Sequence, residues 1–174
     1  LIFLPISALG VEYPGFLVLS DSLLASSGFV AGGPIAIVRE ATVVHEVAHQ
    51  WFYSIVGNNQ VREPWLDEAF AQYLTYRYFD TRQRINRRVV PIGLPAAAYR
   101  GRAYGAVVYG SAALALIELE ESVGRARMEA FLRGVFKQFQ WEVWTNDDFI
   151  GLVHASFPDR ADAWLRRWPL ETDQ

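Results

Sequence analysis

The sequence predicts a mainly α-helical protein with a small β part at its amino terminus, an α+β fold. Short apolar runs typical of strands fall within the first 20 residues, whereas apolar residues recur at helical spacing after residue 41. With 174 residues, 52% of them hydrophobic and 14% aromatic, the chain can bury a packed core. We therefore expect one domain over residues 1–174, with strands and loops in 1–40 and mainly helices in 41–174.

The amino-terminal part is predicted to hold two strands. The runs LIFLPI and FLVLS are apolar, and SALGVEYPG between them carries Gly10, Pro14 and Gly15, which indicate a turn or bend. ASSGFVAGGPI, with three glycines and a proline, is predicted to be a loop. AIVRE after it fits either a short strand or the approach to a helix.

Helix signals dominate the remainder. A first helix is expected from Thr42 as N-cap to Val56, with Gly57 just beyond it, and apolar residues on nearly all its sides predict an interior position. After the loop GNNQVREP, a second helix is expected from Trp65 to Phe79. Further helices are expected near residues 105–122, 125–138, 146–156 and 160–167.

Composition excludes several classes of partner. A net charge of −3 argues against binding to nucleic acid or anionic lipid, and the basic run RQRINRRVV fits a solvated loop or a docking face for another domain. No apolar run reaches the roughly 18 to 20 residues that a transmembrane segment needs. The absence of cysteine excludes thiolate metal ligands, so any metal must be held by nitrogen and oxygen. The compartment stays open between the cytoplasm and an extracytoplasmic domain of a longer parent chain.

The segment HEVAH places two histidines at helical i and i+4 positions. His45 and His49 would lie one turn apart on one face, so both imidazoles can reach one ion. Since the chain has only three histidines, a chance match to HExxH is on the order of one in a few hundred. The motif predicts a metal site.

Glu68 is the candidate for a third ligand. A catalytic zinc takes three protein ligands and keeps one position open. Eighteen residues separate His49 from Glu68, enough to end one helix and lay a second across the ion. An acidic residue flanked by Leu66, Ala69 and Phe70 is expected to be buried, and a buried carboxylate needs a partner such as a metal.

These residues carry a family resemblance. HEVAHQWF, followed after eighteen residues by Glu68 within WLDEAFAQY, resembles the aminopeptidase N family of gluzincin zinc metallopeptidases, whose pattern is HExxH-x18-E. The resemblance implies a thermolysin-like gluzincin catalytic domain in which His45, His49 and Glu68 bind one zinc ion. It also implies that Glu46 acts as the general base on a metal-activated water.

Two looser matches extend the resemblance. GVEYP stands where the family carries a GxMEN motif, keeping Gly10 and Glu12, so both are implied to bind substrate, with Glu12 at the free amino terminus. VVYGSAALAL resembles the family's tyrosine motif and makes Tyr109 the implied catalytic donor to the developing oxyanion. Tyr104 is a rival for that role.

The predicted function is that of a zinc aminopeptidase that hydrolyses the amino-terminal peptide bond of peptides. The alternatives are a zinc endopeptidase of thermolysin-like fold and a catalytically silent interaction module. The family's preceding β domain and following helical domains have no counterpart in these 174 residues, so flanking domains of a longer parent chain are expected.

Overall fold

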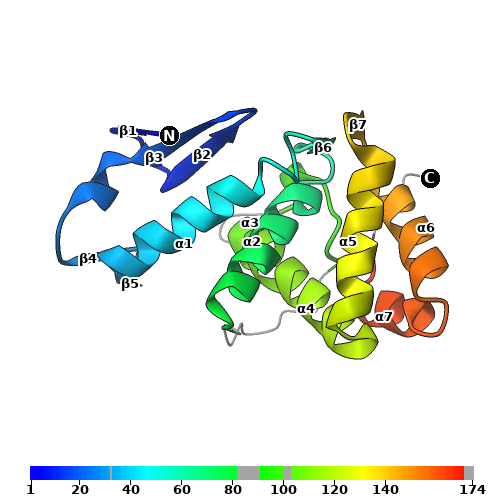
Figure 1. Cartoon of the computed structure of the whole chain (residues 1–174). Coiled ribbons are helices and arrows are strands. Elements are labelled where there is room, and N and C mark those ends of the chain that lie inside the picture. Colours follow the sequence, from blue (N-terminus) through cyan, green and yellow to red (C-terminus); the bar gives the residue numbers. More distant parts are fainter. Residues whose placement is uncertain (32, 82–90, 100–102, 171–174) are drawn as a thin grey trace.

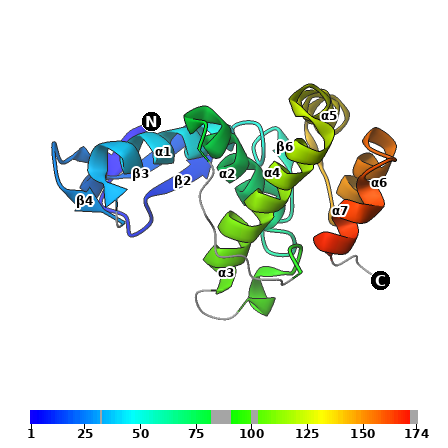
Figure 2. The same ribbon diagram turned by 90° about the horizontal axis from the view of Figure 1, so that it is seen from below.

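The computed structural model describes residues 1–31, 33–81, 91–99 and 103–170. A small β part lies beside the first helix, and the other helices form a second group next to it (Figures 1 and 2). This arrangement confirms the predicted mainly α fold with an amino-terminal β part. The arginines of the basic run lie outside the described residues: Arg82, Arg84, Arg87 and Arg88.

Three strands form the amino-terminal sheet in the order β1-β3-β2. β1 (Ile2–Leu4) runs parallel to the central strand β3 (Phe16–Ser20), and β2 (Gly10–Tyr13) runs antiparallel to it. The two predicted strands are present. The turn or bend predicted over SALGVEYPG is found at Ser7–Leu9, which bend, and at Pro14 and Gly15, which turn with Gly15 at a φ of 75°, but Gly10–Tyr13 between them form the strand β2 instead. A strand of four residues is too short to show a clear alternation of apolar and polar side chains. Its pairing with the apolar β3 decides its conformation.

The first long helix, α1 (Ile35–Ala48), begins seven residues before the predicted Thr42 start. A two-stranded hairpin, β4 (Phe29–Val30) with β5 (Gly33–Pro34), leads into it, so AIVRE forms its first turns. Inside the helix the Thr42 hydroxyl donates to the Val38 carbonyl at 2.8 Å instead of capping an end. The predicted boundary between strands and helices at residue 40 therefore moves back to residue 34.

The helix also ends earlier than the predicted Val56. His49 is its last, capping residue, and the chain then turns to Tyr53, whose φ of 113° is incompatible with a continuing helix. Its apolar residues are not all interior. Ile37 and Val47 on the helix are 57% and 38% exposed, and Trp51 in the turn beyond it is 49% exposed, so only one side of α1 is packed within this chain.

The second long helix, α2 (Trp65–Phe79), has the predicted bounds. It packs against α1 on one side and α4 on another, which places it at the centre of the fold. The remaining helices follow the predicted ranges closely: α3 (Ala103–Gly105), a π-helical segment (Ala106–Ser111), α4 (Ala112–Val123), α5 (Arg125–Phe139), α6 (Asn146–Ser156) and α7 (Ala161–Arg167). Two 3₁₀ turns (Asp21–Leu24 and Ala96–Ala98) and a parallel pair, β6 (Val56–Gly57) with β7 (Glu142–Val143), complete the described elements.

Aromatic side chains dominate the core around α2. Phe70 stacks on Phe52 with ring centroids 4.6 Å apart and meets Trp144 edge to face at 5.3 Å. Trp65 meets Phe149 edge to face at 4.9 Å. Such pairs fix ring orientations as well as burying area. They hold the start of α2, where Glu68 lies, in a defined position.

One helical stretch in the described part of the chain, Ala103–Val123, is long and apolar enough by length and composition to cross a membrane. It contains the π-helical segment and α4, which both pack against α2. Leu116 and Leu119 in it are fully buried. A core helix passes the same test, so this stretch is weak support for a transmembrane segment.

Candidate metal centre

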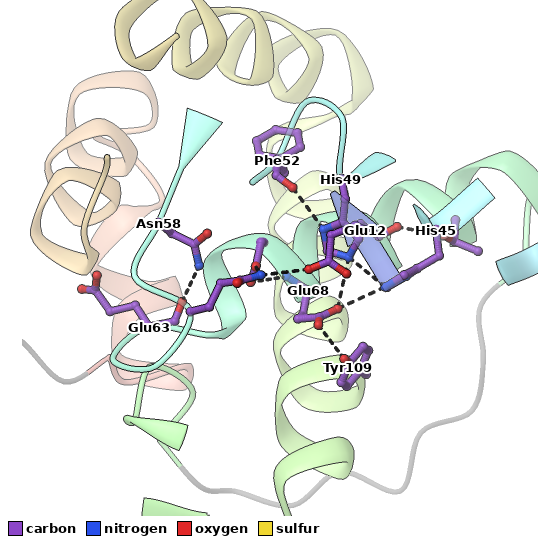
Figure 3. Close-up of polar contacts among 12 residues, drawn as sticks. Glu12, His45, His49, Phe52, Asn58, Glu63, Glu68 and Tyr109 are labelled. Atoms are coloured by element: carbon purple, nitrogen blue, oxygen red, sulfur yellow. Dashed lines mark hydrogen bonds and ion pairs between the residues drawn. The ribbon is translucent and has the colours of Figure 1, made fainter. Parts of the chain in front are cut away.

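Three candidate ligands meet between α1 and α2. His45 Nε2 lies 3.1 Å from His49 Nε2, and Glu68 Oε2 lies 3.1 Å from the first ring nitrogen and 3.3 Å from the second (Figure 3). A tetrahedral zinc site with bonds of about 2.0–2.1 Å has ligand-to-ligand distances of about 3.3–3.4 Å. The three atoms thus have nearly the spacing that one ion requires.

The imidazole of His49 is held in the orientation suited to a ligand. Its Nδ1 lies 3.1 Å from the Phe52 carbonyl, which can only accept a hydrogen bond, so Nδ1 carries the proton. The lone pair of a neutral ring is then on Nε2, which faces the other ligands. The turn that ends α1 at His49 supplies this carbonyl.

Glu68 uses its two carboxylate oxygens differently. Oε2 faces the two imidazoles, while Oε1 accepts a hydrogen bond from the Tyr109 hydroxyl at 2.6 Å. Glu68 lies in the first turn of α2, where the helix dipole stabilises a negative charge. Figure 3 shows Tyr109 reaching Glu68 from the side opposite His49.

The charges of these groups are strongly coupled. Burial would raise the pKa of Glu68, but hydrogen bonds from His45 and His49 outweigh it and lower that pKa to about 2. Burial would lower the pKa of His49, but the hydrogen bond and charge of Glu68 outweigh it and raise that pKa to about 9. Without a bound metal, these opposite shifts keep Glu68 a carboxylate and favour the protonated form of His49 at neutral pH.

Glu46 is buried, with 5% exposure, directly beside the first ligand. Among the described residues, its Oε2 has no hydrogen-bond partner. Burial raises the pKa of Glu46 to about 7, against an opposing effect of His49, and Glu12 and Glu68 add to the rise. A buried carboxylate with a free oxygen and a pKa near neutrality can both take and return a proton.

Glu12 lies on β2 and reaches the same cluster from the sheet. Its carboxylate, a ring nitrogen of His49 and the Asp67 carboxylate offer ligand atoms that all lie within 4.8 Å of one another. Glu12 and His49 thus come together although one is on the sheet and the other at the end of α1 (Figure 3).

Sequence reasoning missed Gln60, on the loop before α2. Its Nε2 donates to Glu12 Oε1 at 2.9 Å and to Asp67 Oδ2 at 2.8 Å. Asp67, the residue before the ligand Glu68, accepts from Gln60 and from the Glu68 backbone N–H. The only sequence signal for Gln60 was a polar side chain in the loop between two site elements.

Of the two candidate tyrosines, Tyr109 is the one hydrogen-bonded to a ligand. It lies in the π-helical segment, a distortion that is often found at functional sites. Tyr104 meets the Tyr109 ring edge to face at 6.2 Å, one layer further from the ligands. Burial and the charge of Glu68 raise the pKa of both hydroxyls, that of Tyr104 to about 12, so both stay protonated donors at neutral pH.

A cleft of about 630 Å³ contains this site. Residues of α1, of β2 with the loop before it, and of α2 line it together with Tyr109. Its lining residues are Ala8, Leu9, Gly10, Glu12, Ala31, Gly33, Ile37, Val38, Ala41, Thr42, His45, Glu46, Glu68, Gln72, Thr75 and Tyr109. His45, Glu68, Glu46 and Glu12 thus open into one cavity large enough for a small ligand, and His49 lies fully buried beside it.

The donor set fits zinc. Two imidazole nitrogens and one carboxylate oxygen are the ligands of many catalytic zinc sites, and the oriented His49 ring supplies the outer hydrogen bond that such ligands need. The cleft on the open side leaves room for a fourth, exchangeable position.

Comparisons with known proteins agree with this geometry. The family model described as the Peptidase family M1 domain matches residues 4–99. Aminopeptidase O of Homo sapiens is 31% identical over 78 residues, covering 45% of this chain and 8% of the relative. Aminopeptidase N of Streptomyces lividans is 47% identical over 36 residues, covering 21% of this chain and 4% of the relative. The chain therefore spans less than a tenth of these relatives.

Solved structures show the same fold over nearly the whole chain. The M1 zinc metallopeptidase from Deinococcus radiodurans matches with a TM-score of 0.74 and 23% identity, covering 99% of this chain and 40% of that one. Native yeast LTA4 hydrolase matches with a TM-score of 0.67 and 18% identity, covering 95% of this chain and 30% of that one. The family match spans more than half of the sequence, so this chain belongs to the M1 family of metallopeptidases.

Proposed function

We propose that residues 1–174 form a single catalytic domain of a zinc aminopeptidase, which removes one residue at a time from the amino terminus of peptides. The observation that carries this proposal is the position of Glu12. Its carboxylate lies within 4.8 Å of a ring nitrogen of the ligand His49. An anchor for a positive charge thus lies directly beside the expected metal ligands.

Glu12 and the ligands lie close enough together for one residue of a substrate to contact both. In a peptide the terminal amine nitrogen and the first carbonyl carbon are about 2.4–2.5 Å apart, because they share one Cα. An ammonium group bound at Glu12 would leave the first carbonyl next to the ligand atoms, and the second carbonyl one residue too far along. A charge-assisted hydrogen bond contributes about 1.5–3 kcal/mol, which favours substrates with a free amine by roughly ten- to a hundredfold.

His45, His49 and Glu68 would hold the zinc ion. When bound, zinc would supply a Lewis acid for the carbonyl and lower the pKa of a water at the site to about 7. Glu46 takes the proton of the attacking water with its free oxygen and returns it to the leaving amine. Its raised pKa, about 7, suits both transfers at neutral pH.

Tyr109 donates a hydrogen bond to the oxygen on which negative charge develops. Its hydroxyl donates to Glu68 Oε1 and therefore already lies beside the ligands. Burial and the charge of Glu68 raise the pKa of this hydroxyl, so it keeps its proton at neutral pH. Oxyanion donors of this kind contribute about 10²- to 10³-fold in rate.

The relatives support the substrate class. Both curated relatives named above are aminopeptidases, and a mutant of the Deinococcus radiodurans M1 zinc metallopeptidase has been crystallised with a Tyr-ser-ala substrate. We extend peptide substrates with a free amino terminus to this chain on that basis, together with the position of Glu12. The expected flanking domains belong to the same proposal, since the solved relatives are more than twice as long.

The decisive experiment compares Glu46→Gln with the unchanged protein, in this chain and in any longer natural form of it. We expect the variant to bind one zinc per chain but to lose hydrolysis of aminoacyl anilides by several orders of magnitude. Full activity of the variant would refute the mechanism. Equal cleavage of free and N-acetylated substrates by the unchanged protein would favour an endopeptidase, and zinc binding without any hydrolysis would favour an interaction module.

A further inference from the structure

Gln60 connects two acidic groups that the proposed mechanism uses separately. One amide nitrogen donates to Glu12 on the sheet at 2.9 Å and to Asp67 on α2 at 2.8 Å. A primary amide carries two N–H hydrogens, so Gln60 can serve both carboxylates at once without adding a charge. The carboxylates of Glu12 and Asp67 lie within 4.8 Å of each other and repel when both are charged. A neutral group that donates to both offsets this repulsion.

The Asp67 end of this bridge is firmly held. Asp67 is 1% exposed, and its other oxygen accepts the Glu68 backbone N–H at 2.8 Å. Asp67 therefore cannot move without disturbing the helix turn that carries the ligand Glu68.

The loop that carries Gln60 is also held. Asn58 donates through its side-chain nitrogen to the Glu63 carbonyl at 3.0 Å, closing the loop on itself (Figure 3). The Glu63 carboxylate accepts the Asn146 backbone N–H at 2.7 Å, which fixes the loop to the start of α6. Gln60 thus extends from a fixed loop to a fixed carboxylate, and Glu12 is the partner that it positions.

We propose that Gln60 is a positioning residue that fixes the Glu12 carboxylate relative to the metal-binding helix α2, and so sets the distance between the anchor for the substrate's amine and the ligands beside which the scissile carbonyl must lie. The proposal rests on the proposed aminopeptidase function. It explains how the enzyme would cut after the first residue of a peptide and not after the second. β2 is a short edge strand that pairs with β3 and packs against α1, so it does not itself link Glu12 to α2; the Gln60 amide supplies that link.

The test measures the contribution of the substrate's amine directly. Inhibition constants are determined for an aminoacyl hydroxamate and for its des-amino analogue, which binds zinc but lacks the ammonium group. In the unchanged protein the ratio of the two constants reports amine recognition. Gln60→Ala is expected to reduce this ratio about tenfold, since Glu12 keeps its charge but loses its position. The des-amino constant and the zinc content should stay within about twofold.

Two further variants separate positioning from general stability. Gln60→Glu keeps the length but replaces the donor by a third carboxylate, so the ratio should fall at least as far. Gln50→Ala is the matched control, because Gln50 fixes the same strand end through Tyr13 and Gly15 without contacting the Glu12 carboxylate. It should retain a ratio close to that of the unchanged protein.

Three results would overturn the proposal. They are an unchanged ratio in both Gln60 variants, an equal loss in Gln50→Ala, and a parallel loss of affinity for the des-amino analogue, which would mark general damage to the site. Absence of hydrolysis and of amine preference in the unchanged protein would instead count against the aminopeptidase function, so the two failures are distinguishable.

Discussion

Gly10 lies so close to Glu46 that a methyl group on its Cα would come within 2.2 Å of Oε1 and 2.5 Å of the carboxylate carbon. No real side chain tolerates such a contact with a neighbouring group. The strand β2 and the buried carboxylate of α1 thus pack with nothing between them. The glycine of GVEYP, assigned by resemblance to substrate binding, has a second consequence that the structure shows: it leaves the space in which Glu46 lies.

We predict that Gly10→Ala lowers kcat/KM by about a hundredfold while leaving the zinc content unchanged. Relief of the clash requires a shift of roughly 1 Å of Glu46 or of β2, and a misplacement of that size can cost about 10²-fold in rate. The measurement is hydrolysis of an aminoacyl anilide beside metal analysis of the same sample. Gly134→Ala is the control, because Gly134 lies in α5 with nothing within 4 Å of the added methyl. It should keep activity and stabilise the helix by about 0.5–1 kcal/mol.

Activity of Gly10→Ala equal to that of Gly134→Ala would show that Glu46 adapts at no cost. The assignment of Glu46 as the proton carrier would then lose its geometric support.

Replacement of the two candidate tyrosines by phenylalanine should distinguish their roles. Tyr109→Phe removes the hydroxyl that contacts Glu68 and is expected to lower kcat by about 10²- to 10³-fold with little change in KM. Tyr104→Phe keeps the edge-to-face ring contact and should leave kcat close to that of the unchanged protein. Steady-state kinetics on one substrate decides between them, and a larger loss in Tyr104→Phe would reassign the donor.

Zinc binding should release close to one proton at neutral pH. The pKa of His49 is raised to about 9 in the metal-free protein, so that ring is protonated at pH 7 and must lose its proton to become a ligand. Zinc affinity should therefore increase about tenfold per pH unit from neutrality and stop increasing from this cause above about pH 9. Calorimetry in two buffers of different ionisation enthalpy counts the protons.

Glu68→Gln is the control for this proton count, since the carboxylate is what holds the proton on His49. It should bind zinc more weakly and release fewer protons at pH 8. Proton release that is absent in the unchanged protein at neutral pH would contradict the coupled charges described here.

The predictable parts of the site are those that depend on the spacing of residues close together in the sequence. His45 and His49 are four residues apart, and Glu68 lies in the apolar run that follows the loop GNNQVREP. The position of Gln60 depends on a contact with Glu12 across 48 residues of sequence, and no local pattern encodes it. The start of α1 was missed because Pro34 gives no side-chain cap and Thr42 is a plausible cap that the fold does not use. Val47 and Trp51 were expected to be buried because they are apolar, but both are partly exposed. An apolar side chain tends to be buried, and the sequence does not show whether another part of the chain covers it.

The cleft extends along one face of α1 beyond the ligands. Three of its lining residues, Val38, Ala41 and Thr42, lie on the same face of the helix as His45 and His49, because they are spaced three and four residues apart. From His49 to Val38 the helix advances about 16 Å, enough for four or five extended residues. With the amine at Glu12, the leaving part of a peptide would follow this face.

Ala41→Phe should therefore act on the leaving side of the substrate. We expect the larger ring to narrow the cleft and lower kcat/KM for tetrapeptides at least tenfold, while an amino acid amide with the same first residue, whose leaving group is ammonia, changes less than twofold. Ala36→Phe provides the control, because Ala36 lies on the exposed side of the same helix and outside the cleft. Equal losses for amide and tetrapeptide would mean that Ala41 supports the ligands rather than the leaving chain, and the substrate would then have to pass the site in another direction.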